Sequence, residues 1–154
     1  MRRIVHFLAV FTSAIITGGQ YVVSFDYSTV DTHASFYTEK MQYAIHHIGK
    51  PLFGMLITAT ILNVICAVLY RGDRRTFYLL LGAAFCFFVG AIITRFGNIP
   101  LLELIDTWSV ASPPLDWKEV ADRWYVFHSV RFAIDLIGLF LAVLSTFARR
   151  DSRA

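Results

Sequence analysis

The sequence predicts an all-α integral membrane protein, a four-helix bundle with structured extracytoplasmic loops. Of its 154 residues, 56% are hydrophobic and only 16% are charged, which is too little charge to cover a soluble domain of this size. Four apolar stretches are each long enough to cross a bilayer, which takes about 20 helical residues. We therefore expect a single membrane domain over residues 1–154, with spans at about 4–23, 51–70, 76–94 and 124–147.

The first apolar stretch also resembles a secretory signal peptide, because Arg2 and Arg3 precede it. It lacks a clear small-x-small cleavage pattern, so we interpret it as a retained first span. Small residues recur at four-residue spacing in every span, for example Ala59, Asn63 and Ala67 in the second. Such stripes let helix backbones approach closely inside a membrane.

Basic residues predict the orientation of the bundle. Eight of the 14 Lys and Arg residues lie in the two tails and in the short second connection: Arg2, Arg3, Arg71, Arg74, Arg75, Arg149, Arg150 and Arg153. Basic tails and short loops stay in the cytoplasm. We therefore expect both termini to be cytoplasmic, in the cell membrane, with both long connections outside. The pI near 9.0 reflects this topology, so no nucleic acid partner is expected.

The two long connections carry helical patterns of their own. From about Phe36 a helix is expected to run directly into the second span. The stretch "NIPLLELIDTW" has helical apolar spacing, and Pro113-Pro114 breaks the chain before Asp116, which can begin the last helix. Cys66 and Cys86 are expected to differ in depth by about 9 Å, too far for a disulfide. Without a Cys-x-x-Cys pair, a membrane thiol oxidase is excluded.

Ionisable residues occupy one face of the last span. His128, Arg131 and Asp135 recur at spacings of three and four, which places them on one helical stripe. An unpaired charge at that depth costs several kcal/mol, so this face is expected to look inward. Arg131 can pair with Asp135 or with an acceptor from another span. The other spans bring polar residues to the same level: Gln20, Tyr21, His46, His47, Lys50, Thr94, Arg95 and Asn98.

The second half of the chain resembles a known family. "GNIPLLELIDTW" followed by "DRWYVFHSVR" is similar to the anthrone oxygenase-like family of small four-span membrane proteins. The matching positions are Asn98, Pro100, Leu101, Trp108, Arg123, Trp124, His128 and Arg131. The resemblance covers about residues 94–145. Two departures are Leu102, where the family often has a second Asn, and His128, whose position is often Asn.

The resemblance implies a reaction. Family members linked to anthraquinone pathways oxidise anthrones with O₂ and no obvious cofactor, which requires a base, an electropositive group near the developing oxyanion and an apolar pocket. His128 or His47 is then the expected base, and Arg131 and Asn98 are the oxyanion partners.

The depths of the polar residues on the spans predict where a substrate would bind. We expect an outward-opening pocket among spans two, three and four, lined by His47, Asn98, His128 and Arg131. Pro100 is expected to turn the chain beyond Asn98. The flat substrate is expected to contact Trp124, Phe127 and Phe96. Asp135, expected to orient Arg131, and Lys50 are the structural polar groups.

Two other functions fit the sequence. A non-enzymatic membrane partner or assembly subunit needs no base and would use the aromatic outer loops for docking, within an oligomer or a larger membrane complex. A haem- or metal-binding redox protein would use His46 or His47 with His128, although no metal-ligand spacing occurs. For the oxygenase, the expected partners are membrane lipid and a small aromatic substrate, with no cofactor and no metal.

Overall fold

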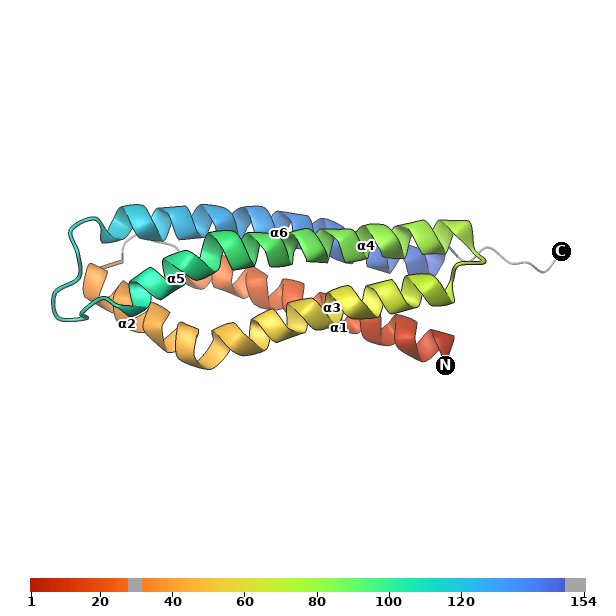
Figure 1. Cartoon of the computed structure of the whole chain (residues 1–154), viewed down its shortest axis with the longest axis horizontal. Coiled ribbons are helices and arrows are strands. Elements are labelled where there is room, and N and C mark those ends of the chain that lie inside the picture. Colours follow the sequence, from red (N-terminus) through yellow and green to blue (C-terminus); the bar gives the residue numbers. More distant parts are fainter. Residues whose placement is uncertain (28–31, 149–154) are drawn as a thin grey trace.

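Four long helices form the bundle. The computed structural model describes residues 1–27 and 32–148, and Figure 1 shows the long helices side by side along one axis. They are α1 (Arg2–Asp26), α3 (Lys50–Leu69), α4 (Arg74–Ile93) and α6 (Trp117–Phe147). Each belongs to a continuous helical segment long and apolar enough to cross a membrane. The predicted all-α bundle is confirmed, and the described residues contain no strand.

Two of the spans extend well beyond the predicted bounds. α2 (Ala34–Ala44) continues into α3 through the π-helical turn η1 (Ile45–Gly49). In the same way, α4 continues through η2 (Thr94–Asn98) into α5 (Ile99–Asp106). The helix expected from about Phe36 into the second span is therefore confirmed, as is the helical pattern after Asn98.

A proline follows each π-helical turn. Pro51 and Pro100 each lie two residues beyond the last π-helical residue. A proline inside a helix has no N–H to donate and clashes with the carbonyl four residues earlier. The wider π turn is the kind of local adjustment that accompanies such a bend. The expectation that Pro100 turns the chain was wrong, because the helix bends at η2 and continues.

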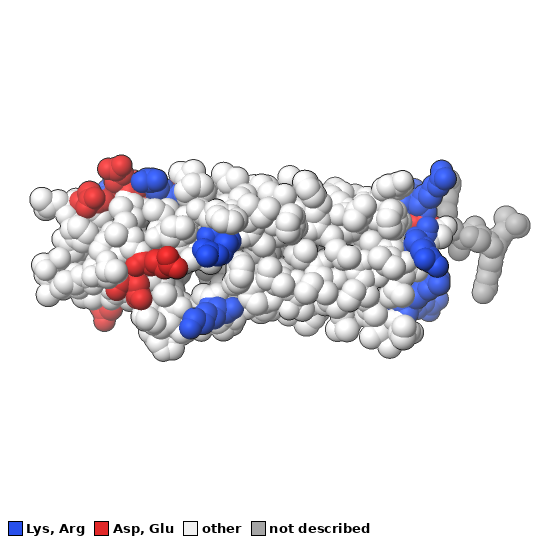
Figure 2. Space-filling model, in the orientation of Figure 1, with Lys and Arg blue, Asp and Glu red and all other residues white. Residues whose placement is uncertain are grey.

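The two ends of the bundle differ in charge. Figure 2 shows Lys and Arg side chains at one end and most of the visible acidic side chains toward the other. The first end carries the N-terminus and the α3–α4 connection (Figure 1), so we call it the arginine end. The opposite end, formed by α2, α5 and the connection to α6, is the loop end. Cys66 and Cys86 are both free.

The loop end has its own apolar core. Tyr37, Met41, Ile105 and Trp124 are buried there in one cluster. The amide of Gln42 donates to the carbonyls of Ile105, Asp106 and Trp108 at 3.2, 3.3 and 2.9 Å. α2 is thereby fixed to α5, while α3 packs on α4 toward the arginine end. Between these two contacts the π-helical turns diverge.

Candidate functional site

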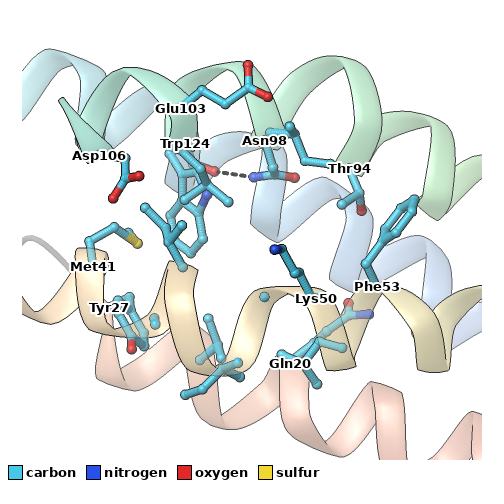
Figure 3. Close-up of a pocket in the computed structure, with 18 of the residues that line it drawn as sticks. Gln20, Tyr27, Met41, Lys50, Phe53, Thr94, Asn98, Glu103, Asp106 and Trp124 are labelled. Atoms are coloured by element: carbon cyan, nitrogen blue, oxygen red, sulfur yellow. Dashed lines mark hydrogen bonds between the residues drawn. The ribbon is translucent and has the colours of Figure 1, made fainter.

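A cavity occupies the space where the two π-helical turns diverge. Its volume is about 360 Å³, within the range of small-molecule pockets. Figure 2 shows a hollow on this side of the bundle, and Figure 3 shows the lining from close by. The lining residues come from all four spans: Gln20, Val23, Tyr27, Met41, Ala44, Ile45, Ile48, Gly49, Lys50, Leu52, Phe53, Thr94, Asn98, Ile99, Leu102, Glu103, Asp106, Trp124 and Arg131.

The lining is mostly apolar, with polar groups at a few positions. Lys50 extends from the first turn of α3 toward Asn98 (Figure 3). Among the described residues, its ammonium has no hydrogen-bond or ion-pair partner. Asn98 Nδ2 donates to the carbonyl of Trp124 at 3.1 Å, which holds the amide over the cavity. A cation therefore faces the cavity opposite an anchored amide.

Arg131 is anchored by two side chains. Its Nη1 donates to Thr94 Oγ1 at 2.9 Å, and its Nη2 donates to His128 Nδ1 at 2.8 Å. Thr94 belongs to η2, so the predicted pairing of Arg131 with an acceptor from another span is confirmed. No ion pair between Arg131 and Asp135 forms in the described part of the chain. The guanidinium is therefore held by neutral acceptors and keeps its positive charge available to the cavity.

His128 supports Arg131 from behind and does not line the cavity. The ring is fully buried and stacks on Trp124, with centroids 5.2 Å apart. Because a guanidinium only donates, Nδ1 must accept from Arg131, and the ring hydrogen lies on Nε2. Nε2 is 3.1 Å from the carbonyl of Gln20 and 3.1 Å from Ser24 Oγ. In this arrangement the one basic lone pair of His128 is already occupied.

Gln20 links the first span to this network. Its Nε2 donates to Asp135 Oδ2 at 2.7 Å, while its carbonyl accepts from His128. Asp135 was expected to orient Arg131 but is bonded to Gln20 instead. Gly90 leaves room for the carboxylate, since a Cβ there would overlap Asp135 Oδ1. We did not select Gln20 as a site residue, although an amide inside an apolar span is itself a signal.

Four lining residues carry buried polar atoms without a hydrogen-bond partner in the described structure. Trp124 Nε1 and Arg131 Nε are donors, whereas Asn98 Oδ1 and Gln20 Oε1 are acceptors. Leaving such an atom unpaired costs about 1–3 kcal/mol, so a group of them around one cavity requires an explanation such as a ligand or ordered water. Four residues of the lining thus hold buried donors and acceptors that are unpaired in the described structure.

Comparison with known families identifies a family for most of the chain. The anthrone oxygenase family model matches residues 43–141. The chain belongs to the anthrone oxygenase family. No curated protein and no solved structure matches the chain. The family match runs from the end of α2 into α6 and includes Lys50, Asn98, Trp124 and Arg131, whereas Gln20 lies outside it.

Besides His128, three residues that the sequence analysis nominated lie outside the cavity lining. Phe96 is 74% exposed, because two helical residues before the inward-facing Asn98 it points the opposite way. The Phe127 ring packs against Gly97, where a Cβ would come within 2.7 Å of it. His47 is exposed, donates from Nδ1 to the carbonyl of Tyr43 at 2.9 Å and stacks on the Tyr43 ring. The cavity therefore lies at the predicted level and includes Asn98 and Arg131, but His47 and His128 do not line it, whereas Lys50, Trp124 and residues of the first span do.

The remaining histidine of the second span has an acidic partner. His46 Nε2 lies 3.0 Å from Asp106 Oδ1, and Asp106 lines the cavity. Within residues 1–27 and 32–148, no group of three His, Cys, Asp or Glu side chains is placed to hold a metal ion.

Proposed function

We propose that this anthrone oxygenase family member oxidises a flat polycyclic ketone of the anthrone type with O₂, inside the cavity between η1 and η2. The observation that carries this proposal is the set of unpaired donors and acceptors around an otherwise apolar cavity. A planar aromatic ketone matches that pattern, because its faces need apolar contact and its oxygens need hydrogen bonds.

The cations supply the electrostatics of the reaction. Removing a proton from the CH₂ group of an anthrone places negative charge on the carbonyl oxygen. Arg131 and Lys50 line the cavity with positive charge, and Trp124 Nε1 adds a neutral donor. Donors fixed in advance at a developing oxyanion can lower a barrier by about 3–4 kcal/mol each. In this proposal Asn98 Oδ1 and Gln20 Oε1 accept from hydroxyl groups of the substrate.

We assign the removal of the substrate's CH₂ proton to Asp106. Its carboxylate lines the cavity at the loop end and is bonded to His46, so it is placed to take a proton from the substrate carbon. The resulting carbanion forms a C–O bond with O₂, and the proton completes a hydroperoxide. Loss of water then leaves a carbonyl group. Each turnover converts one CH₂ and one O₂ into one C=O and one H₂O, so atoms and electrons balance without a cofactor.

We further propose that the chain lies in the cell membrane with the arginine end in the cytoplasm. The arginines of the α3–α4 connection and of the N-terminus support this orientation. Single cysteines placed in the 71–75 connection should then react with a membrane-impermeant maleimide only after the cells are opened. Labelling of intact cells would contradict the orientation.

The enzymatic proposal is tested by oxygen uptake. Purified protein in lipid nanodiscs is supplied with anthrone, and O₂ consumption is compared with anthraquinone absorbance. We expect one O₂ per quinone, with turnover reduced at least tenfold in Lys50→Met and in Asp106→Asn. Matched controls are Lys40→Met, because Lys40 pairs with Asp26 outside the cavity, and Asp116→Asn at the start of α6. Tight anthrone binding without turnover would instead favour the non-enzymatic binding protein.

A further inference from the structure

We infer that the cavity exchanges its ligand sideways with the lipid bilayer, through an opening between η1 and η2. The inference takes the class of ligand from the proposed function. It adds that this ligand enters from the lipid bilayer and not from water. An uncharged polycyclic ketone with one polar edge would enter from the membrane interface, without passing through the aqueous loop end.

The loop end is closed to such a molecule. Tyr37, Met41 and Ile105 are buried there in one apolar cluster. The three hydrogen bonds from Gln42 fix α2 to α5 across the same end. The contact between His46 in η1 and Asp106 at the end of α5 also joins the two helical segments at this end. A ligand the size of the cavity cannot pass this end while these contacts hold.

The other walls are closed by helix packing. α1 and α6 form the back of the cavity through Gln20 and Trp124, both buried. Toward the arginine end, Leu56 and Phe87 fill the bundle in a second buried cluster. The side between η1 and η2 is not closed by any of these contacts, and Figure 2 shows the hollow on this side.

The rim of that side is exposed and lies at the edge of the hydrocarbon. Ile48, Lys50 and Glu103 line the cavity and are exposed on the bundle surface. α3 contains 20 residues from Lys50 to Leu69, and 20 residues of helix span about 30 Å, the thickness of the hydrocarbon core. With the arginine end at one boundary, the opening lies at the other. Amphipathic aromatic molecules accumulate at that depth, as Trp and Tyr side chains do.

The experiment uses a ligand that cannot leave the membrane. An anthraquinone carrying a diazirine is attached to a short acyl chain of a phospholipid and mixed into proteoliposomes. After illumination, cross-linked peptides are identified by mass spectrometry. The full-length protein carries Cys66→Ala and Cys86→Ala, with one new cysteine introduced by Ile48→Cys or by Ile57→Cys. These isoleucines are 39% and 38% exposed, and only Ile48 lines the cavity.

We expect the tethered anthraquinone to cross-link peptides of the cavity in both variants before any modification. Reaction of the cysteine introduced at position 48 with a bulky maleimide should then lower the cross-linked fraction at least fivefold, whereas the same modification at position 57 should leave it unchanged. Because each protein is compared with itself before modification, a folding defect cannot produce this result.

Three outcomes would overturn the inference. If free anthraquinone labels the cavity but the tethered form does not, the ligand enters from water and the proposed function stands. Equal labelling after modification at position 48 would place the opening elsewhere. If neither form labels the cavity, the ligand class is wrong, and the inference falls together with the proposed function.

Discussion

His128 Nδ1 accepts a hydrogen bond from Arg131 Nη2 at 2.8 Å, one helical turn away on α6. This contact changes the interpretation of His128. The sequence suggested that it is the catalytic base, whereas in the structure it accepts a hydrogen bond that holds Arg131 in place. The ring stacks on Trp124 on one side and is bonded to Gln20 on the other. We therefore treat His128 as a positioning residue that fixes Arg131 and Trp124 at the cavity.

Substitution of His128 separates these two roles. His128→Asn can still present an amide oxygen to Arg131, so we expect turnover within about threefold of wild type. His128→Phe keeps a ring on Trp124 but offers no acceptor, and we expect a loss of at least tenfold with the fold retained. Steady-state kinetics and circular dichroism check both. Equal, complete loss in the two variants would restore His128 as the base.

Arg131 should also contribute to stability. Arg131→Ala removes the donor to both Thr94 and His128, and we expect a loss of about 1–3 kcal/mol in the free energy of unfolding. Arg123→Ala, on the exposed face of α6, should change it by less than about 0.5 kcal/mol. Thermal unfolding in detergent measures the difference. Identical melting temperatures would show that the buried guanidinium contacts contribute nothing.

Gly90 provides the space that Asp135 occupies. Gly90→Ala places a Cβ where the Asp135 carboxylate now lies, and overpacking of this kind costs about 1–3 kcal/mol. Gly54→Ala is the matched control, since a Cβ there meets nothing within 4 Å. We expect the control to be neutral or stabilising, because alanine favours the helix. If both variants unfold at the same temperature, α4 and α6 are packed less closely than described.

Gln20 and Asp135 should be coupled. Gln20→Leu leaves the buried Asp135 carboxylate without its 2.7 Å donor, so we expect a loss of about 1–3 kcal/mol or more. Replacing both partners removes the stranded group, and Gln20→Leu with Asp135→Leu should recover part of that loss. A double-mutant cycle measures the coupling. Strictly additive effects would argue against the bond.

The spans and the inward polar face could be predicted from the sequence. Length and apolar content identify a membrane helix, and the three- and four-residue spacing of His128, Arg131 and Asp135 places them on one face. Asn98 and Trp124, which the sequence analysis nominated as site residues, both line the cavity. These predictions succeeded because they depend on helical periodicity and on the cost of burying polar groups in lipid.

The sequence predicted the residues that line the cavity less accurately than it predicted the spans. Periodicity counted at 100° per residue fails through η1 and η2, because a π turn rotates all later side chains relative to an α-helix. Lys50 lines the cavity, whereas the expected His47 does not. The role of His128 could not be predicted either, because the sequence does not show whether its imidazole accepts a hydrogen bond from Arg131 or is free to act as a base. Gln20 lay outside the resembling segment.

The central claim is that the cavity binds an anthrone and removes its proton before O₂ takes part. The most direct measurement mixes protein in nanodiscs with anthrone under strict exclusion of O₂ and records the absorption spectrum. We predict the long-wavelength band of the enolate, saturating at one equivalent per chain and absent in Arg131→Met, followed by conversion to the quinone when O₂ is admitted. Tightly bound anthrone that shows no enolate band, or a band of equal size in Arg131→Met, would contradict the account.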